Sequence, residues 1–321
     1  MAKMIHGPAL PQIHIGLEDY IRIARPDHWF KNLFMLPGIA LAMVLAGVHW
    51  SDALWPSIIA IISTCFVASA NYVINEWLDA EFDRHHPIKK HRPSALGRVR
   101  ARYVYVEYAV LASLGLWLAS FLTQEFFWIS VLLLVMGVLY NVRPFRTKEI
   151  AFLDVLSESV NNPIRLLLGW SALVSAQLPP SSILLAYWMG GAFLMAMKRY
   201  AEFRFINNPE QAGLYRASFK QYTEESLLLS TFFYALTSVF FLGIFLVKYR
   251  IEFILTFPLL AALFTWYLAI GLKPYSASQT PEKLYREKAF VSFVVLLCIA
   301  IAALFVVEIP ALSVFVEPIQ Y

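Results

Sequence analysis

One stretch of the chain carries a polar residue at every fourth position: Asn71, Asn75, Asp79 and Asp83. On a helix each of these side chains lies next to the following one, so together they form a single polar face. Mg²⁺ prefers oxygen ligands in proteins and commonly shares the phosphates of a substrate with one or two carboxylates. The spacing therefore indicates a Mg²⁺–phosphate site. The same acids would also suit a solvated loop in which they pair with the Lys and Arg residues that follow.

A second polar stripe lies farther along the chain, in an otherwise apolar segment. Asp154, Glu158, Asn161 and Arg165 are four, three and four residues apart, and Asn162 broadens the stripe. Charged side chains that face lipid are costly, so the stripe is expected to face the interior of a helix bundle. Two acid-bearing helices that meet at one mouth would form a dinuclear Mg²⁺ site or a diphosphate clamp. A purely structural polar network is the alternative.

Cationic side chains stand close to both acidic groups in the sequence. Arginine makes bidentate contacts to phosphate, and lysine neutralises phosphate as a point charge. Membrane topology alone would also account for these cations and for the nearby tyrosines. The histidines His85, His86 and His91 lack metal-ligand spacing and are interpreted as loop residues. The predicted substrate-binding residues are Lys31, Asn71, Lys89, Arg92, Tyr140, Lys148, Asn161, Asn162, Arg165, Lys198, Arg199, Tyr200 and Glu202, with Glu202 expected to pair with Lys198.

The elements that position these residues are expected to be transmembrane helices. Of the 321 residues, 59% are hydrophobic and only 15% are charged, a balance that soluble globular domains do not usually show. A membrane span needs roughly 20 mostly apolar residues. We therefore predict an all-α polytopic membrane protein with about nine transmembrane helices, at 33–49, 54–78, 104–122, 126–141, 151–173, 183–199, 226–247, 252–272 and 289–308.

No fixed-period repeat or soluble-domain linker divides the chain. Residues 33–321 are therefore predicted to form a single transmembrane catalytic domain, preceded by a cytosolic interfacial segment at 1–32. This segment mixes aromatic, aliphatic and basic residues, as expected at a membrane interface. It lacks an uninterrupted apolar core, so we expect it to belong to the mature protein and not to a cleaved signal peptide.

The basic residues predict the orientation of the chain. All but three of the 26 Lys and Arg residues fall in the N-terminal segment or in the loops at 79–103, 142–150, 198–225 and 273–288. By the positive-inside rule, these loops, the N-terminus and the mouth of the site are cytosolic. We therefore predict an integral membrane protein of the cell (plasma) membrane.

A transporter is the alternative from a different functional class, because intramembrane acids and Arg165 would then line a pathway. Transporters generally place their sites near the bilayer midplane and often contain internal repeats. Here the acids gather toward one mouth and no repeat is evident, so the pattern favours an enzyme.

The acidic stretch "NEWLDAEFD" resembles the N-D-x-x-D-x-x-x-D signature of the UbiA superfamily of intramembrane prenyltransferases. The segment from Asp154 to Glu158 is similar to the second aspartate motif of that superfamily, and the predicted layout of nine spans also matches. Two positions depart from the usual pattern, because Glu76 and Glu158 stand where the superfamily usually has Asp. Both keep a carboxylate, so the resemblance still implies a Mg²⁺ site, formed by Asn75, Asp79, Asp83, Asp154 and Glu158.

Three further stretches resemble the branch of decaprenyl-phosphate phosphoribosyltransferases: "RPDHWFKN", "DRHHPIKKHRPSALG" and "KRYAE". The stretch "YNVRPFRTKEIAFLD" is instead similar to a loop of the lipid-quinone type of prenyltransferase. The first resemblance implies transfer of 5-phosphoribose from phosphoribosyl pyrophosphate to a polyprenyl phosphate. The second implies transfer of a prenyl group from a prenyl diphosphate to an aromatic or other acceptor.

Both reactions imply the same kinds of partner. The expected partners are a donor that carries a diphosphate, an isoprenoid lipid and the bilayer, with Mg²⁺ as cofactor and no nucleic acid. Whether the chain forms a homo-oligomer is left open.

Overall fold

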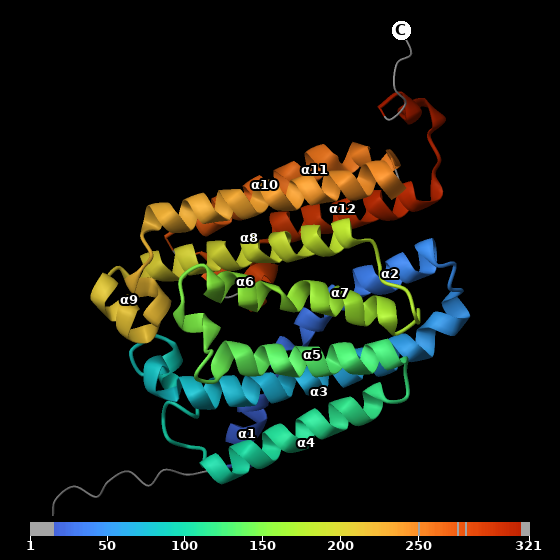
Figure 1. Ribbon diagram of the computed structural model, residues 1–321. Coiled ribbons are helices and arrows are strands. Elements are labelled where there is room, and N and C mark those ends of the chain that lie inside the picture. Colours follow the sequence, from blue (N-terminus) through green and yellow to red (C-terminus); the bar gives the residue numbers. More distant parts are fainter. Residues whose placement is uncertain (1–15, 250, 275, 280, 316–321) are drawn as a thin grey trace, which may run out of the picture.

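A computed structural model describes residues 16–315 except 250, 275 and 280, and these residues form only helices and connecting loops (Figure 1). The all-α fold class is therefore confirmed. Residues 1–15 of the predicted interfacial segment lie outside the described residues. The helices are α1 (Leu17–Ala24), α2 (Leu36–Leu45), α3 (Trp50–Asp83), α4 (Ala101–Ala119), α5 (Gln124–Asn141), α6 (Leu153–Ser159), α7 (Asn161–Ser171), α8 (Ser181–Ile206), α9 (Pro209–Tyr215), α10 (Glu224–Tyr249), α11 (Phe257–Gly271) and α12 (Lys288–Val306).

Every predicted span overlaps at least one of these helices. Within the described residues, five stretches are long and apolar enough to cross a membrane: Leu17–Leu45, Trp50–Asp83, Gln124–Asn141, Glu224–Tyr249 and Ile251–Gly271. The predicted number of nine crossings is therefore not confirmed. Large apolar side chains such as Trp117, Phe232, Phe240 and Ile299 are exposed on the outside of the bundle, as expected for contact with lipid.

The predicted helix at 151–173 is interrupted. It consists of α6, which ends at Ser159, and α7, which begins at Asn161. Pro163 explains the interruption, because a proline lacks the backbone N–H and its ring clashes with the carbonyl four residues earlier, here that of Ser159. The second polar stripe is consequently divided, with Asp154 and Glu158 on α6 and the remaining residues on α7.

The short helix α2 packs against α7 through two glycines. A Cβ atom on Gly38 would lie 2.0 Å from the carbonyl oxygen of Leu166, and a Cβ atom on Gly169 would lie 2.1 Å from that of Met35. The two backbones approach closely because neither glycine has a side chain, as is common between membrane helices. This contact fixes α7 against the N-terminal part of the bundle.

We predict that Gly169→Ala lowers the temperature at which the protein unfolds in detergent, because the added methyl group has no room against the backbone of Met35. Gly243→Ala in α10 is the matched control, since a Cβ atom there meets nothing within 4 Å. The control substitution should leave this temperature unchanged or raise it, because alanine favours a helix more than glycine does. Equal thermal stability of the two variants would show that the α2–α7 contact is not tight.

Candidate active site

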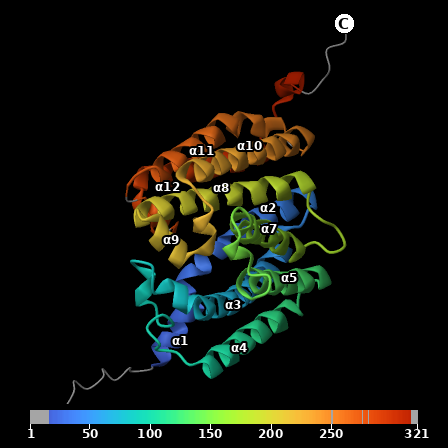
Figure 2. The same ribbon diagram turned by 60° about the vertical axis from the view of Figure 1, so that its left-hand side comes forward.

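A cavity of about 730 Å³ opens at the end of the bundle where α3 and α8 terminate. Figures 1 and 2 show α9 and the loop after α3 gathered at this same end. Both α3 and α8 run toward this end, so their last turns face the cavity. Most of the predicted site residues line it: Lys31, Asn71, Asn75, Asp79, Asp83, Lys89, Arg92, Tyr140, Glu158, Asn161, Lys198, Arg199 and Glu202.

One wall of the cavity is the polar face of α3. Asn71 donates a hydrogen bond from Nδ2 to the carbonyl oxygen of Leu133 at 2.8 Å, and Asn75 donates to the side chain of Asn141. A Cβ atom on Gly137 would lie 2.0 Å from Oδ1 of Asn71, so the glycine leaves room for this amide. The four-residue spacing read from the sequence therefore does place one face of α3 on the cavity.

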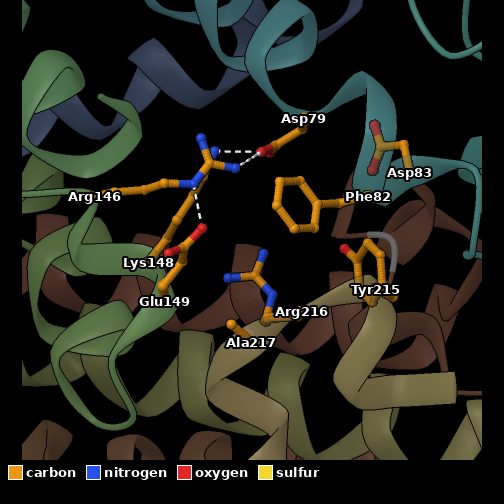
Figure 3. Close-up of a pocket in the computed structure, with 9 residues that line it drawn as sticks. All are labelled: Asp79, Phe82, Asp83, Arg146, Lys148, Glu149, Tyr215, Arg216 and Ala217. Atoms are coloured by element: carbon orange, nitrogen blue, oxygen red, sulfur yellow. Dashed lines mark hydrogen bonds and ion pairs between the residues drawn. The ribbon is translucent and has the colours of Figure 1, made fainter. Parts of the chain in front are cut away.

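Asp79 is held by two cations from the loop after α5. Its Oδ1 lies 3.0 Å from Nη2 of Arg146 and 2.5 Å from Nζ of Lys148 (Figure 3). Burial lowers the pKa of Lys148 to about 8, although the carboxylate of Asp79 opposes this shift. Lys148 lines a smaller pocket that adjoins the cavity, together with Asp79, Asp83 and Arg216.

The loop after α3 folds back onto the site. Arg92 bonds to Asp83 at 2.6 Å, and Lys89 bonds to Glu202 at 2.6 Å, so Glu202 does not pair with Lys198 as predicted. His86 is buried, and its Nδ1 accepts hydrogen bonds from the backbone N–H groups of Ile88 and Lys89. Its other nitrogen, Nε2, lies 3.3 Å from Oε1 of Glu202 and must therefore carry the proton.

His86 lies in the loop after α3, as predicted, but it is buried and contacts a residue of the cavity. Burial lowers the pKa of this imidazole, and the hydrogen bond with Glu202 opposes that shift only in part. His86 helps to orient Glu202, which is contacted by Lys89 from the same loop.

The most deeply buried part of the site is centred on Arg199 of α8. Its guanidinium lies 3.0 Å from the carboxylate of Asp154 and 2.7 Å from that of Glu158. Tyr140 donates a hydrogen bond to Glu158 at 2.6 Å and accepts one from Arg199 at 3.2 Å. Helices α5, α6 and α8 are therefore joined at this point by charged and polar side chains.

Asp154 has no exposed surface and is not among the residues that line the cavity. Tyr222 and Ser218 donate hydrogen bonds to its carboxylate at 2.7 and 3.3 Å, and Arg216 lies 3.6 Å from it. Asp154 lies behind Arg199 and positions it. The two acids predicted as a metal-binding pair on α6 are thus in different surroundings, since only Glu158 reaches the cavity.

Three other predicted residues also lie outside the cavity lining. Arg165 bonds to Oδ1 of Asn32 at 3.0 Å and to the backbone carbonyl of Asn161 at 3.2 Å, and so ties α7 to the N-terminal segment. Asn162 packs against Gly191 of α8. Tyr200 is buried and accepts a hydrogen bond from Arg204 at 3.4 Å.

Comparison with known proteins agrees with this architecture. The model of the UbiA prenyltransferase family matches residues 35–294, which is most of the chain. The chain belongs to the UbiA prenyltransferase family. The prediction of a UbiA-type transferase is thereby confirmed at the level of the family.

Two similar UbiA relatives are named decaprenyl-phosphate phosphoribosyltransferase. The protein from Mycolicibacterium smegmatis is 33% identical over 64% of this chain and 63% of its own length. The protein from Mycobacterium tuberculosis (strain CDC 1551 / Oshkosh) is 32% identical over 64% of this chain and 67% of its own length. The alignment therefore spans about two thirds of each relative.

A solved structure shows the same fold. The UbiA homolog from Archaeoglobus fulgidus bound to GPP and Mg²⁺ superimposes with a TM-score of 0.68 and 21% identity, over 90% of this chain and all of that chain. At this level of identity the likeness establishes the UbiA fold alone.

The donor atoms on the α3 wall fit a hard cation of the kind seen in that UbiA homolog. Within the described part of the chain, no three His, Cys, Asp or Glu side chains come close enough to hold a metal ion by themselves. Mg²⁺, however, needs only one or two carboxylates when substrate phosphates and water complete its shell. Asp79, Asp83 and Asn75 supply such oxygens, and Oδ1 of Asn161 is a buried acceptor without a hydrogen-bond partner.

Several residues of the site were not among the predicted ones. Arg25 pairs at 2.9 Å with Glu76, which is almost fully buried, and both line the cavity. Tyr215, the last residue of α9, and Arg216, which follows it, also line the cavity. Arg25 falls within "RPDHWFKN", the entry motif that resembles the phosphoribosyltransferase branch. No comparable motif marks the segment that contains Tyr215 and Arg216.

We predict that Asp154→Asn destabilises the protein by about 3–5 kcal/mol, because it leaves the buried guanidinium of Arg199 without one of its carboxylates. The exposed pair Arg204–Glu224 offers a control, and Glu224→Gln should change stability by about 0–1 kcal/mol. Thermal unfolding of both variants in the same detergent measures the difference. If both variants unfold at the same temperature, Asp154 does not carry the role assigned to it.

Proposed function

We propose that this UbiA protein transfers 5-phosphoribose from phosphoribosyl pyrophosphate to a polyprenyl phosphate and releases pyrophosphate. The observation that carries the proposal is a cavity in which an oxygen-rich wall on α3 faces cations from four other segments. Such an arrangement suits two phosphorylated substrates and a divalent cation together. The two relatives with this name support the same reaction.

The proposed chemistry is a displacement at the C1 carbon of the ribose. An oxygen of the acceptor phosphate forms a bond to C1 while the bond from C1 to pyrophosphate breaks, and pyrophosphate leaves with the electron pair. Bound Mg²⁺ would supply Lewis-acid stabilisation of the charge that develops on pyrophosphate. Asn75, Asp79, Asp83 and Glu158 would hold the metal, and Asp154 would act through Arg199.

The site needs no strong general base for this reaction, because a phosphate acceptor is already anionic at neutral pH. The chain's own contribution is to bind and orient the two substrates. Arg199 and Tyr140 lie on the cavity wall in fixed positions, since each bonds to Glu158. Arg92 and Lys89 reach the cavity from the loop after α3 and would contact donor phosphates.

Prenyl transfer from a prenyl diphosphate to an aromatic or other acceptor is the second candidate. It is favoured by the similarity of "YNVRPFRTKEIAFLD" to the lipid-quinone type, and the Archaeoglobus fulgidus UbiA homolog was solved with GPP and Mg²⁺. Transport is disfavoured, because the acids of α3 lie in its last turns at one end of the bundle.

We further propose that the mouth of the cavity faces the cytosol from the cell membrane, with residues 33–321 acting as one catalytic domain. The basic loops lie at this end, which supports the orientation through the positive-inside rule. Helix α1 belongs to the described part of the interfacial segment and lines the cavity through Ile21, and both Leu17 and Ile21 are exposed.

We predict that Asp79→Asn and Asp83→Asn each reduce transfer at least about 100-fold, since each removes a carboxylate expected to hold Mg²⁺. Glu81→Gln is the matched control, because Glu81 is on the same turn of α3 but is exposed and outside the cavity lining. The assay follows label from phosphoribosyl pyrophosphate into the lipid phase with purified protein, Mg²⁺ and a polyprenyl phosphate.

Removal of Mg²⁺ with EDTA should abolish the same transfer. Near-normal activity in both aspartate variants would contradict the proposed metal site. Protein that moves no label from phosphoribosyl pyrophosphate, but consumes a prenyl diphosphate with an aromatic acceptor, would establish the second candidate instead.

A further inference from the structure

Two partly buried lysines in the cavity differ from its other buried or partly buried cations, a group that leaves out the exposed Arg22. Most of the cavity-lining cations in the described chain have a carboxylate within 4 Å. The pairs are Arg25–Glu76, Lys89–Glu202, Arg92–Asp83, Arg199–Asp154 and Arg216–Asp154. Lys31 and Lys198 are partly buried and line the cavity, but the described residues give neither of them such a partner.

The contacts of Lys31 are with neutral or aromatic groups. Its Nζ lies 3.4 Å from a ring nitrogen of His28 and 5.8 Å from the centre of the Tyr72 ring. Lys198 lines the same cavity, where the positive charge of Lys31 acts on it unfavourably. Glu158 and Glu202 attract Lys198 from a distance, but both carboxylates are already bound by other cations.

Two like charges that share a partly buried cavity without a counter-ion are unfavourable. They are retained at a cost to stability, as residues of functional sites often are. Because both line the same cavity, an anion bound there would neutralise them, and a phosphate oxygen is the acceptor that lysine commonly neutralises.

Lys198 is set farther back along its helix than the two aspartates of the metal-binding wall. It lies eight residues before the end of α8, which corresponds to about 12 Å along the helix. Asp83 is the last residue of α3 and Asp79 is one turn earlier, whereas Asn75, like Lys198, is eight residues from the end of its helix. An anion bound at Lys198 is therefore separated from Asp79 and Asp83, although not from the whole α3 wall.

The surroundings of Lys31 also indicate how that anion arrives. The same short segment exposes three apolar residues that are suited to contact with lipid, Trp29, Phe30 and Leu33. An anion attached to an isoprenoid chain could thus reach Lys31 while its tail stays in the bilayer. A water-soluble phosphate has no apolar part that would contact this surface.

We propose that the ammonium groups of Lys31 and Lys198 together bind the phosphate monoester of the lipid acceptor. This inference rests on the proposed function, which it deepens by separating an acceptor-phosphate site from the donor site. It also explains how the site would select a phosphorylated acceptor over an aromatic one, since an uncharged ring would leave both cations without a counter-ion.

The test is thermal unfolding of the full-length protein in detergent without Mg²⁺, with farnesyl phosphate or farnesol as the probe. A ligand that binds only the folded protein raises the unfolding temperature. We expect farnesyl phosphate to bind at least about tenfold more tightly than farnesol, since the phosphate makes charged contacts. Lys31→Gln and Lys198→Gln should each remove this preference, whereas Lys90→Gln, an exposed lysine outside the cavity lining, should retain it.

The stability of the variants without ligand shows whether they fold. Lys31→Gln and Lys198→Gln should unfold at the same or a higher temperature than the unaltered protein, because each removes an unpaired charge. Lys198→Arg keeps the charge and should keep most of the preference for farnesyl phosphate. Equal binding of the two probes by the unaltered protein, or a preference that survives in both glutamine variants, would overturn the proposal.

Competition separates the two sources of phosphate. Phosphoribosyl pyrophosphate at saturating concentration should not displace farnesyl phosphate, and displacement would show that the lysines hold the donor instead. In the transfer assay, the glutamine variants should raise KM for the polyprenyl phosphate about tenfold and change KM for the donor less than about twofold. Intact binding of farnesyl phosphate without any transfer would refute the proposed function while leaving the phosphate site in place.

Discussion

The structure depends on one electrostatic constraint: a charge inside an apolar bundle must be matched by an opposite charge. Asp154 and Arg199 satisfy it most completely, since both are almost fully buried and lie 3.0 Å apart. Tyr222 and Arg216 reach the same carboxylate from the segments before α10. This single acid therefore joins α6 and α8 to the end of the bundle where the cavity opens, and the cavity's walls depend on its neutralisation.

Local spacing predicted the parts of the site that lie on an unbroken helix. The polar face of α3 runs from Asn71 to Asp83 as expected, because a helix without an interruption places every fourth residue on one side. The same reasoning failed on the second stripe, where the break before Pro163 separates α6 from α7. The proline was visible in the sequence, so this interruption could have been predicted from its known effect on helices.

The choice of partners could not be predicted in the same way. Glu202 is four residues from Lys198 but pairs with Lys89, which is 113 residues away in the sequence. His86 and Arg216 join the site for the same reason, because loops fold back onto the bundle and bring distant charges together. Spacing identifies which residues share a helix face, whereas the pairing across helices depends on packing that no local pattern contains.

The acids of α3 are members of ion pairs, and they are also the proposed ligands of a metal. These two roles are physically compatible. Asp79 is paired with Arg146 and Lys148, and Asp83 with Arg92. Under the proposed function, a divalent cation and a pyrophosphate would bring both signs of charge to the site together. Asp79 and Asp83 would hold the metal, and Arg92, Arg146 and Lys148 would neutralise the phosphate oxygens, so that neither set of charges would be left unpaired. The three cations belong to loops and not to the helices that form the bundle.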